Sequence, residues 1–107
     1  MNLIVIICDT LRRDFLGAYG NEWMRTPSLD ALAEESLVFD RARIGSFPTI
    51  PQRAELMSGH HVYHTTGWAP LAPGAVTFPM LLHEQGYVTG MVTDHIQFMH
   101  PGMNYHR

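Results

Sequence analysis

The chain has little positive charge, a single cysteine and no long apolar run among its 107 residues. Its seven basic residues are all arginines, and ten acidic residues bring the net charge to −3. Such a balance lacks the basic surface that nucleic-acid binding requires. One cysteine, Cys8, cannot form an internal disulfide. These absences exclude a nucleic-acid partner and a disulfide-stabilised scaffold.

The apolar run Leu3–Cys8 is far shorter than the ~20 residues that a membrane-spanning helix needs. It also lacks the charged start and the cleavage site of a signal peptide. If Met1 is the native start, we expect a cytoplasmic protein without a membrane partner. The sequence does not indicate an oligomeric state.

The same run is rich in β-branched residues and predicts a buried strand, with Cys8 packed at its end. Asp9 follows directly, at the point where α/β sheets collect their ligands. Its carboxylate suits a hard cation such as Mg²⁺, Mn²⁺ or Ca²⁺. Alternatively, Asp9 bonds to nearby backbone N–H groups and simply ends the strand. The residues alone favour neither interpretation.

The segment Thr49–Gly59 places a hydroxyl side chain two residues before a proline and an arginine four residues on. Proline is tolerated in the first turn of a helix, so the pattern predicts a helix over 51–57 that begins near Thr49 and ends at Gly59. A helix N-terminus favours negative charge. Thr49 and Arg53 could therefore attack or hold a tetrahedral oxyanion. Thr49 and Gln52 also fit an ordinary capping box.

The rest of the chain predicts alternating helices and strands. The expected elements are a helix capped by Thr26 with Pro27 at its first position, a strand or extended arm over 37–44, a loop over 60–73, a helix over 77–85 stopped by Gly86, and a strand over 87–93. The residues expected on buried helix faces are Leu29, Leu32 and Ala33 in the first helix and Phe78, Leu81 and Leu82 in the second. The final residues, 101–107, predict no closing element.

The histidines form one loose cluster and one isolated candidate. His60, His61 and His64 lie close together in the loop, and a zinc site would need a further partner. A structural or surface role is favoured there over substrate contact or metal binding. His95 follows the last predicted strand, where catalytic groups collect in α/β folds. It could protonate a leaving group or bind a substrate oxygen.

Four segments, in order, carry a resemblance to a known family. They are 2–20 (NLIVIICDTLRRDFLGAYG), 26–33 (TPSLDALA), 49–59 (TIPQRAELMSG) and 86–90 (GYVTG). Together they resemble the N-terminal portion of the sulfatase family, which belongs to the alkaline phosphatase superfamily of metal-dependent hydrolases. The resemblance implies an α/β sandwich with a largely parallel central sheet. Residues 1–107 would be the N-terminal part of that domain, and we expect this part to be inactive alone.

Carried over residue by residue, the resemblance makes Asp9 a metal ligand, Thr49 the nucleophile and a second metal ligand, and Arg53 its neighbouring arginine. The cation would be divalent (Mn, Mg, Ca or Zn), and the substrate a small phosphate or sulfate ester. The chain departs from the family at three further positions. They are Thr10, where many sulfatases have a second ligating aspartate, Gln52, where the motif has serine, and Asp94, about where sulfatases carry a lysine.

The largest departure is Thr49 itself, because the resembled family has Cys or Ser there and oxidises it to formylglycine. Thr49 should remain an alcohol. A formylglycine hydrate can expel sulfate through its second hydroxyl, whereas a threonine ester must be cleaved by water. That chemistry favours a phosphate ester, of phosphodiester or phosphonate type, as the main prediction. The alternative is a sulfuric ester, as in arylsulfatases.

Two predictions from other classes stay open. The chain could be a truncated, non-catalytic remnant, or a flavodoxin-like module that binds an anion without chemistry. The second lacks a glycine-rich phosphate loop after the first strand. The catalytic prediction requires the Thr49 oxygen and the Asp9 carboxyl group to converge on one pocket at the rim of the sheet.

Overall fold

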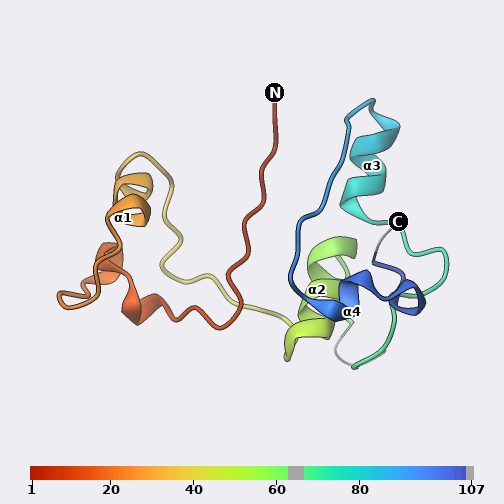
Figure 1. Ribbon diagram of the computed structural model, residues 1–107, viewed down its shortest axis with the longest axis horizontal. Coiled ribbons are helices and arrows are strands. Elements are labelled where there is room, and N and C mark those ends of the chain that lie inside the picture. The colour runs from red at the N-terminus through yellow and green to blue at the C-terminus, as the bar shows by residue number, and fades with distance from the viewer. Residues whose placement is uncertain (63–66, 106–107) are drawn as a thin grey trace. The chain divides into compact units, whose positions relative to one another are not determined.

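The computed structural model describes residues 1–62 and 67–105 and divides into two compact units. The first unit is Met1–Ala42 and the second is Arg43–Arg107. Figure 1 shows the helices of each unit joined by long irregular segments.

The first unit contains two 3-10 turns, η1 (Arg13–Phe15) and η2 (Gly17–Tyr19), and the helix α1 (Pro27–Glu34). Thr26 occupies the N-cap position of α1, and Pro27 begins the helix, as expected. The Thr26 hydroxyl does not cap the helix. It accepts the N–H of Gly17 at 2.9 Å and donates to Asp30 Oδ1 at 3.0 Å, so it fastens α1 to η2.

Arginines stabilise the turns of this unit. Arg12 pairs with Asp14, and this contact raises the pKa of the guanidinium and lowers the pKa of the carboxyl group. Arg13 lies over the ring of Tyr19, 4.4 Å from its centroid, and donates to the carbonyl oxygen of Asp40 at 2.7 Å. Both arginines therefore make contacts inside their own unit.

The second unit contains the helices α2 (Thr49–Ser58), α3 (Phe78–Glu84) and α4 (Ile96–Met99) and the 3-10 turn η3 (Pro101–Met103). Helices α2 and α3 contact each other. The core of this unit gathers side chains from α2, α4 and the segments around them. Its buried members are Ile50, Ala54, Leu71, Phe98 and Tyr105.

The end of the described chain packs back onto the start of α2. The Tyr105 hydroxyl donates to the carbonyl oxygen of Ile50 at 3.2 Å, and its ring meets Phe98 edge to face at 4.8 Å. Burial raises the pKa of Tyr105. The Asn104 amide donates to the carbonyl oxygen of Leu71 at 2.9 Å. These contacts correct the expectation that residues 101–107 contain no closing element, because α4 and η3 close the core of this unit.

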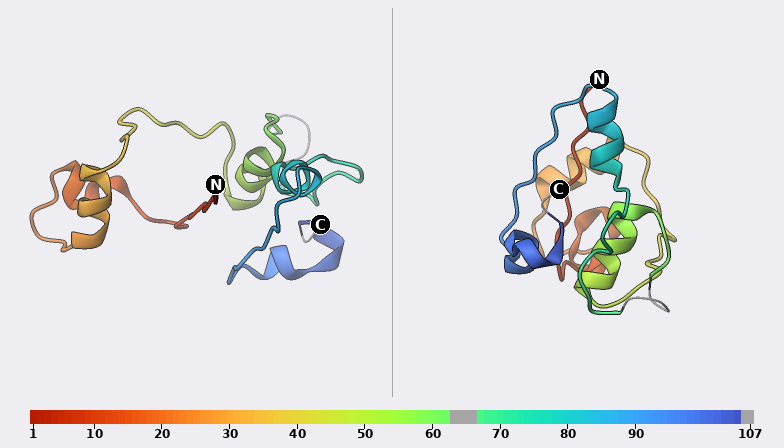
Figure 2. Two further views of the ribbon diagram at one scale, coloured as in Figure 1. Left: turned by 90° about the horizontal axis from the view of Figure 1, so that it is seen from above. Right: turned by 90° about the vertical axis from the view of Figure 1, so that its right-hand side faces the viewer.

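The predicted strands are not formed within the part of the chain that the structure describes. Residues 3–8, 37–44 and 87–93 form no strand, and residues 3–8 are all exposed. A strand requires a neighbouring segment to share its backbone hydrogen bonds, and these segments have no such ladder here. For the described residues, the predictions of a buried strand over Leu3–Cys8 and of a packed Cys8 are therefore wrong, and the central sheet is not confirmed. In Figures 1 and 2, the segment after α3 runs without coiling to α4.

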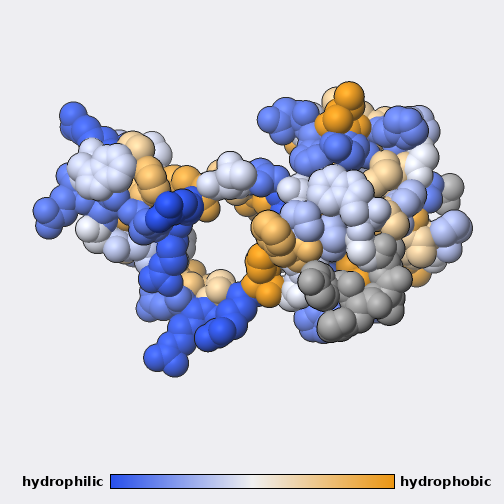
Figure 3. Space-filling model, turned by 90° about the horizontal axis from the view of Figure 1, so that it is seen from below, coloured by the Kyte–Doolittle hydropathy of each residue, from blue (hydrophilic) through white to orange (hydrophobic). Residues whose placement is uncertain are grey.

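These segments carry large exposed side chains. Ile4 and Ile6 are each about four-fifths exposed, and Val88 and Val92 are fully exposed. Figure 3 shows hydrophobic side chains, in orange, on the surface beside strongly hydrophilic ones. Isolated apolar side chains are normal on a surface, but runs of them mark a contact site.

Two helix faces also differ from expectation. Leu29 and Leu32 of α1 are exposed, so the predicted buried stripe is wrong apart from half-buried Ala33. In α3, Phe78 and Leu82 are half-buried, whereas Leu81 is exposed. The helices begin where their prolines predict, but the layer that would cover their apolar faces is not among the described residues.

Candidate functional site

Thr49 is the first residue of α2, so the structure confirms a helix N-terminus at this residue. Pro48 is the N-cap, and its carbonyl oxygen accepts the N–H of Gln52 at 3.2 Å. The helix begins two residues earlier than predicted, and Thr49 lies inside it rather than at the cap. The Thr49 side chain is half-buried, above the fully buried Ile50 and Pro51. A hydroxyl here lies within the positive end of the helix dipole.

Arg53 lies four residues after Thr49, on the same face of α2. Its guanidinium is half-buried and donates to the side-chain oxygen of Gln52. Gln52, which stands where the resembled motif has serine, therefore orients Arg53. The helix face carries one hydroxyl and one permanent positive charge, the pair that sequence reasoning proposed for oxyanion chemistry.

Glu55 forms a cluster with residues on both sides of α2. Its Oε1 lies 2.9 Å from His61 Nδ1, and its side chain is 13% exposed. The pKa of Glu55 is lowered, first by the Ser46 hydroxyl and then by His61 and the backbone of Val62, against the opposing effect of burial. The buried Ser46 Oγ lies near the carboxylate but makes no hydrogen bond among the described residues. Sequence reasoning missed this cluster.

Asp9 lies in a turn of the first unit and is exposed. Thr10 follows with φ 60°, a left-handed conformation that is unusual for a β-branched residue. Because residues 3–8 form no strand, Asp9 does not lie at the end of one, as had been predicted. Asp9 belongs to one unit and Thr49 to the other, so their convergence on a shared pocket stays a prediction.

His95 is the N-cap residue of α4 and is half-buried. Its backbone N–H donates to the Thr93 hydroxyl at 3.1 Å, and its ring lies 5.1 Å from that of Phe98. Its Nδ1 is buried without a hydrogen-bond partner among the described residues. These contacts place His95 beside the core of its unit, and its catalytic role stays a prediction.

The other candidate histidines have different surroundings. His61 is exposed and pairs with Glu55, which is the structural role favoured for the cluster. His60 is exposed, and its backbone N–H donates to the Ser58 hydroxyl at 3.3 Å. His64 lies outside the described residues. Asp94, about where a lysine is expected in the resembled family, is exposed.

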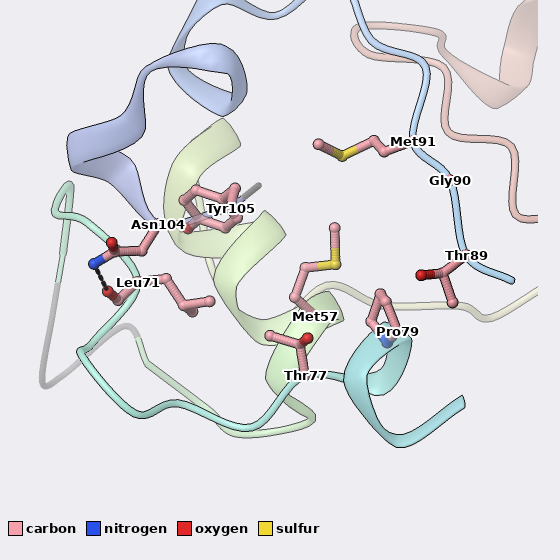
Figure 4. Close-up of a pocket in the computed structure, with 9 residues that line it drawn as sticks. All are labelled: Met57, Leu71, Thr77, Pro79, Thr89, Gly90, Met91, Asn104 and Tyr105. Carbon is pink, nitrogen blue, oxygen red and sulfur yellow. Dashed lines mark hydrogen bonds between the residues drawn. The ribbon is translucent and has the colours of Figure 1, made fainter. Parts of the chain in front are cut away.

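A cavity of about 160 Å³ lies beside the C-terminal half of α2 (Figure 4). Its lining is Met57, Leu71, Thr77, Pro79, Thr89, Gly90, Met91, Asn104 and Tyr105. The buried Thr77 Oγ1 has no hydrogen-bond partner among the described residues. Neither Thr49 nor Arg53 lines this cavity, so it is separate from the predicted catalytic face of the helix.

Within residues 1–62 and 67–105, no three His, Cys, Asp or Glu side chains form a group that could hold a metal ion. The two predicted ligands, Asp9 and Thr49, offer a carboxylate and a hydroxyl. Such hard oxygen donors fit a divalent cation such as Mg²⁺ or Ca²⁺ better than a soft one. The oxygen donors of Asp9 and Thr49 are therefore of the type that a divalent cation prefers. Further ligands would be needed to complete its coordination.

Comparison with known proteins identifies the family. The family model described as Sulfatase matches residues 1–103. The chain belongs to the sulfatase family. This confirms the resemblance drawn from the four sequence segments, and the family implies an alkaline-phosphatase-like α/β fold whose sheet the described residues do not form.

Curated relatives support the assignment. Iduronate 2-sulfatase of Homo sapiens is 33% identical over 110 residues, which cover 97% of this chain and 19% of the relative. Steryl-sulfatase of Rattus norvegicus is 33% identical over 106 residues, covering 85% of this chain and 18% of the relative. Arylsulfatase D of Homo sapiens is 30% identical, with 85% and 18% covered. The chain thus spans about a fifth of the length of these relatives.

These names bear on the predicted substrate class. All three relatives are named sulfatases, which favours the sulfuric ester alternative over the phosphate ester that Thr49 alone suggested. No solved structure matches the chain. Among the described residues, no helix has the length and apolar character to span a membrane.

Proposed function

We propose that this chain is the N-terminal part of a metal-dependent hydrolase domain that cleaves sulfuric esters of small molecules. The observation that carries the proposal is the position of Thr49 as the first residue of α2, with Arg53 one turn further on the same face. Family membership and the names of the relatives support the sulfuric ester as the substrate class. The activity belongs to the full-length protein.

In this proposal the Thr49 hydroxyl oxygen attacks the sulfur of the bound ester, and the bond from sulfur to the leaving alkoxide breaks. The Thr49 proton passes to solvent water as the new bond forms, and the leaving oxygen takes up a proton, for which His95 is the candidate donor. Arg53 and the first turn of α2 stabilise the charge on the remaining sulfate oxygens. Water then attacks the sulfur, the bond from sulfur to the Thr49 oxygen breaks, hydrogen sulfate leaves and the Thr49 oxygen regains a proton.

The family implies a divalent cation, and Asp9 and Thr49 are the residues of this chain that would hold it. When bound, the cation supplies positive charge that makes deprotonation of a neighbouring hydroxyl easier. The chain's own contribution is to present the hydroxyl at the end of a rigid helix and to orient Arg53 through Gln52.

A phosphate ester is the second candidate, and one specific observation favours it. Position 49 is threonine, which keeps a plain alcohol and so forms an ester that only water can cleave. Attack on phosphorus by an alcohol, followed by hydrolysis with a bound cation, is well suited to such a residue. The same residues would act in the same roles.

The two substrate classes can be separated with matched substrates. An aryl sulfate and an aryl phosphodiester with the same aryl leaving group are given to the full-length protein with Mg²⁺, Mn²⁺, Ca²⁺ or Zn²⁺. We expect kcat/KM to be higher for the sulfate. A preference for the phosphodiester would establish the second candidate, and turnover of neither would contradict the hydrolase proposal.

A further inference from the structure

Glu55 is an acidic side chain on the nucleophile helix that the proposed chemistry does not use. It lies six residues after Thr49, toward the C-terminal end of the helix. Its side chain is only 13% exposed, although a charged carboxylate normally stays in water. A largely covered carboxylate is retained where it has specific partners, and Glu55 has them in two separate loops.

The first loop leads into the nucleophile. Ser46, three residues before Thr49, is 2% exposed and is the largest cause of the lowered pKa of Glu55. Gly45 lies so close that an added Cβ would come within 2.6 Å of Glu55 Oε2 and of His61 Nδ1, and within 2.8 Å of Glu55 Oε1. The carboxylate therefore occupies the space that any other residue at position 45 would need.

The second loop leaves the helix. Gly59 ends α2 in the left-handed conformation, with φ 71°, and its N–H donates to the carbonyl oxygen of Glu55 at 2.7 Å. The chain then turns back, so that His61 and the backbone of Val62 reach the same carboxylate. His61 itself is 88% exposed, and an ion pair so open to water contributes little. Its ring nevertheless fixes the place of the second loop, because Nδ1 would lie 2.6 Å from a Cβ added to Gly45 of the first loop.

We propose that Glu55 is a positioning residue that fixes the loop before Thr49 by clamping it to the loop after α2. Gly45 of the first loop and His61 of the second are the residues that meet at the carboxylate. The proposal rests on the proposed function of Thr49 as nucleophile. Because residues 45–48 set the direction in which the chain enters the helix, releasing them moves the hydroxyl without removing it.

A double-mutant cycle tests the clamp in the full-length protein. The variants are Gly45→Ala, Glu55→Ala and both together, and the matched control is Glu84→Ala, an exposed acid on α3. Gly45→Ala pushes the carboxylate away, and Glu55→Ala removes it, so both break the same contact. The effect of the double variant on amide exchange and on kcat should then be no larger than that of the more affected single variant. The reason is that substitutions that break one shared contact do not have additive effects.

Hydrogen exchange provides a readout that does not depend on activity. In Glu55→Ala we expect the amides of residues 46, 47 and 49 to exchange about tenfold faster or more, because the loop before Thr49 loses the carboxylate that it packs against. Gly45→Ala should have the same effect, and Glu84→Ala none. Additive changes in the double variant would overturn the clamp, whether or not the protein proves to be a hydrolase.

Kinetics separate positioning from general stability. For the ester that the protein cleaves, Glu55→Ala should lower kcat on the order of 10- to 100-fold while KM changes little. Glu55→Gln, which keeps the size and one carbonyl acceptor, should recover part of the loss. Faster exchange with an unchanged kcat would overturn the positioning role while leaving the proposed function intact. If Glu55→Ala does not fold, Glu55→Gln against Glu84→Gln gives the same comparison.

Discussion

At the scale of single residues, the lowered pKa of the Glu55 carboxyl group links this side chain to stability. Its ordinary value is 4.5, and the Ser46 hydroxyl and His61 favour the charged form in the folded protein. A carboxyl whose pKa is lower when folded stabilises the protein above its unfolded pKa. That contribution is lost as the pH falls through the folded pKa.

We therefore predict that the melting temperature of Glu55→Gln falls less steeply than that of the wild type as the pH is lowered into the acidic range. Melting temperatures of the wild type and the variant should converge as the pH falls below the ordinary value of 4.5 and the wild-type carboxylate becomes protonated. Glu84→Gln should follow the wild type throughout. A Glu55→Gln profile parallel to the wild type from pH 7 to pH 3 would show that the folded pKa is not lowered.

Single residues also show what the sequence could and could not reveal. The helix that carries Thr49 and Arg53 was predictable because proline and glycine mark its two ends, which is local information. The roles of the two residues came from the family resemblance and stay predictions. Glu55 was missed because its partners come from two loops that only the fold brings together. Gly45 was the available signal, since a glycine outside a turn can mark a close approach.

At the scale of elements, helix boundaries were predictable and helix faces were not. Helices were expected over 51–57 and 77–85, and they run over 49–58 and 78–84. Their starts and ends depend on Pro51, Gly59 and Gly86, whose effects are local. Burial of a face depends on a partner layer, and for α1 that layer is not among the described residues.

The short elements at the end of the chain were missed for a related reason. Residues 101–105 look like a simple loop because they contain proline and glycine. In the structure, η3 and the left-handed Asn104 turn Tyr105 back onto α2, where it is buried. A contact between residues 50 and 105 leaves no periodic pattern in the sequence, so pattern reasoning could not find it.

Gly59 provides a prediction at this scale. A side chain at φ 71° is strained, and no atom lies within 4 Å of an added Cβ, so Gly59→Ala isolates the backbone effect. We expect a loss of about 1 kcal/mol in the free energy of unfolding, measured by denaturant titration. Gly90→Ala is the control, because that position has equal space and no positive φ. Equal losses in the two variants would contradict the role of Gly59 as the helix stop.

At the scale of the whole molecule, the extended segments are the main open feature. Residues 3–8 and 87–93 have the composition of strands, expose large apolar side chains and form no strand among the described residues. The family to which the chain belongs implies a fold with a central sheet. We propose that these two segments become strands when the full-length protein supplies their neighbours.

Hydrogen exchange tests this proposal directly. In the isolated 107 residues, amides 3–8 and 87–93 should exchange at nearly the rate of an unstructured chain. In the full-length protein the same amides should be protected as strongly as those of α2. Rapid exchange of both segments in the full-length protein would contradict their assignment as strands.

The central claim is that Thr49 acts as the nucleophile, and its most direct measurement is ester turnover by Thr49→Ala and Thr49→Ser in the full-length protein. Thr49→Ala should lose on the order of a thousandfold or more in kcat with the fold preserved, because no group replaces the attacking oxygen. Thr49→Ser, which keeps an alcohol, should retain measurable turnover. If Thr49→Ala cleaved the ester as fast as the wild type, Thr49 could not be the nucleophile.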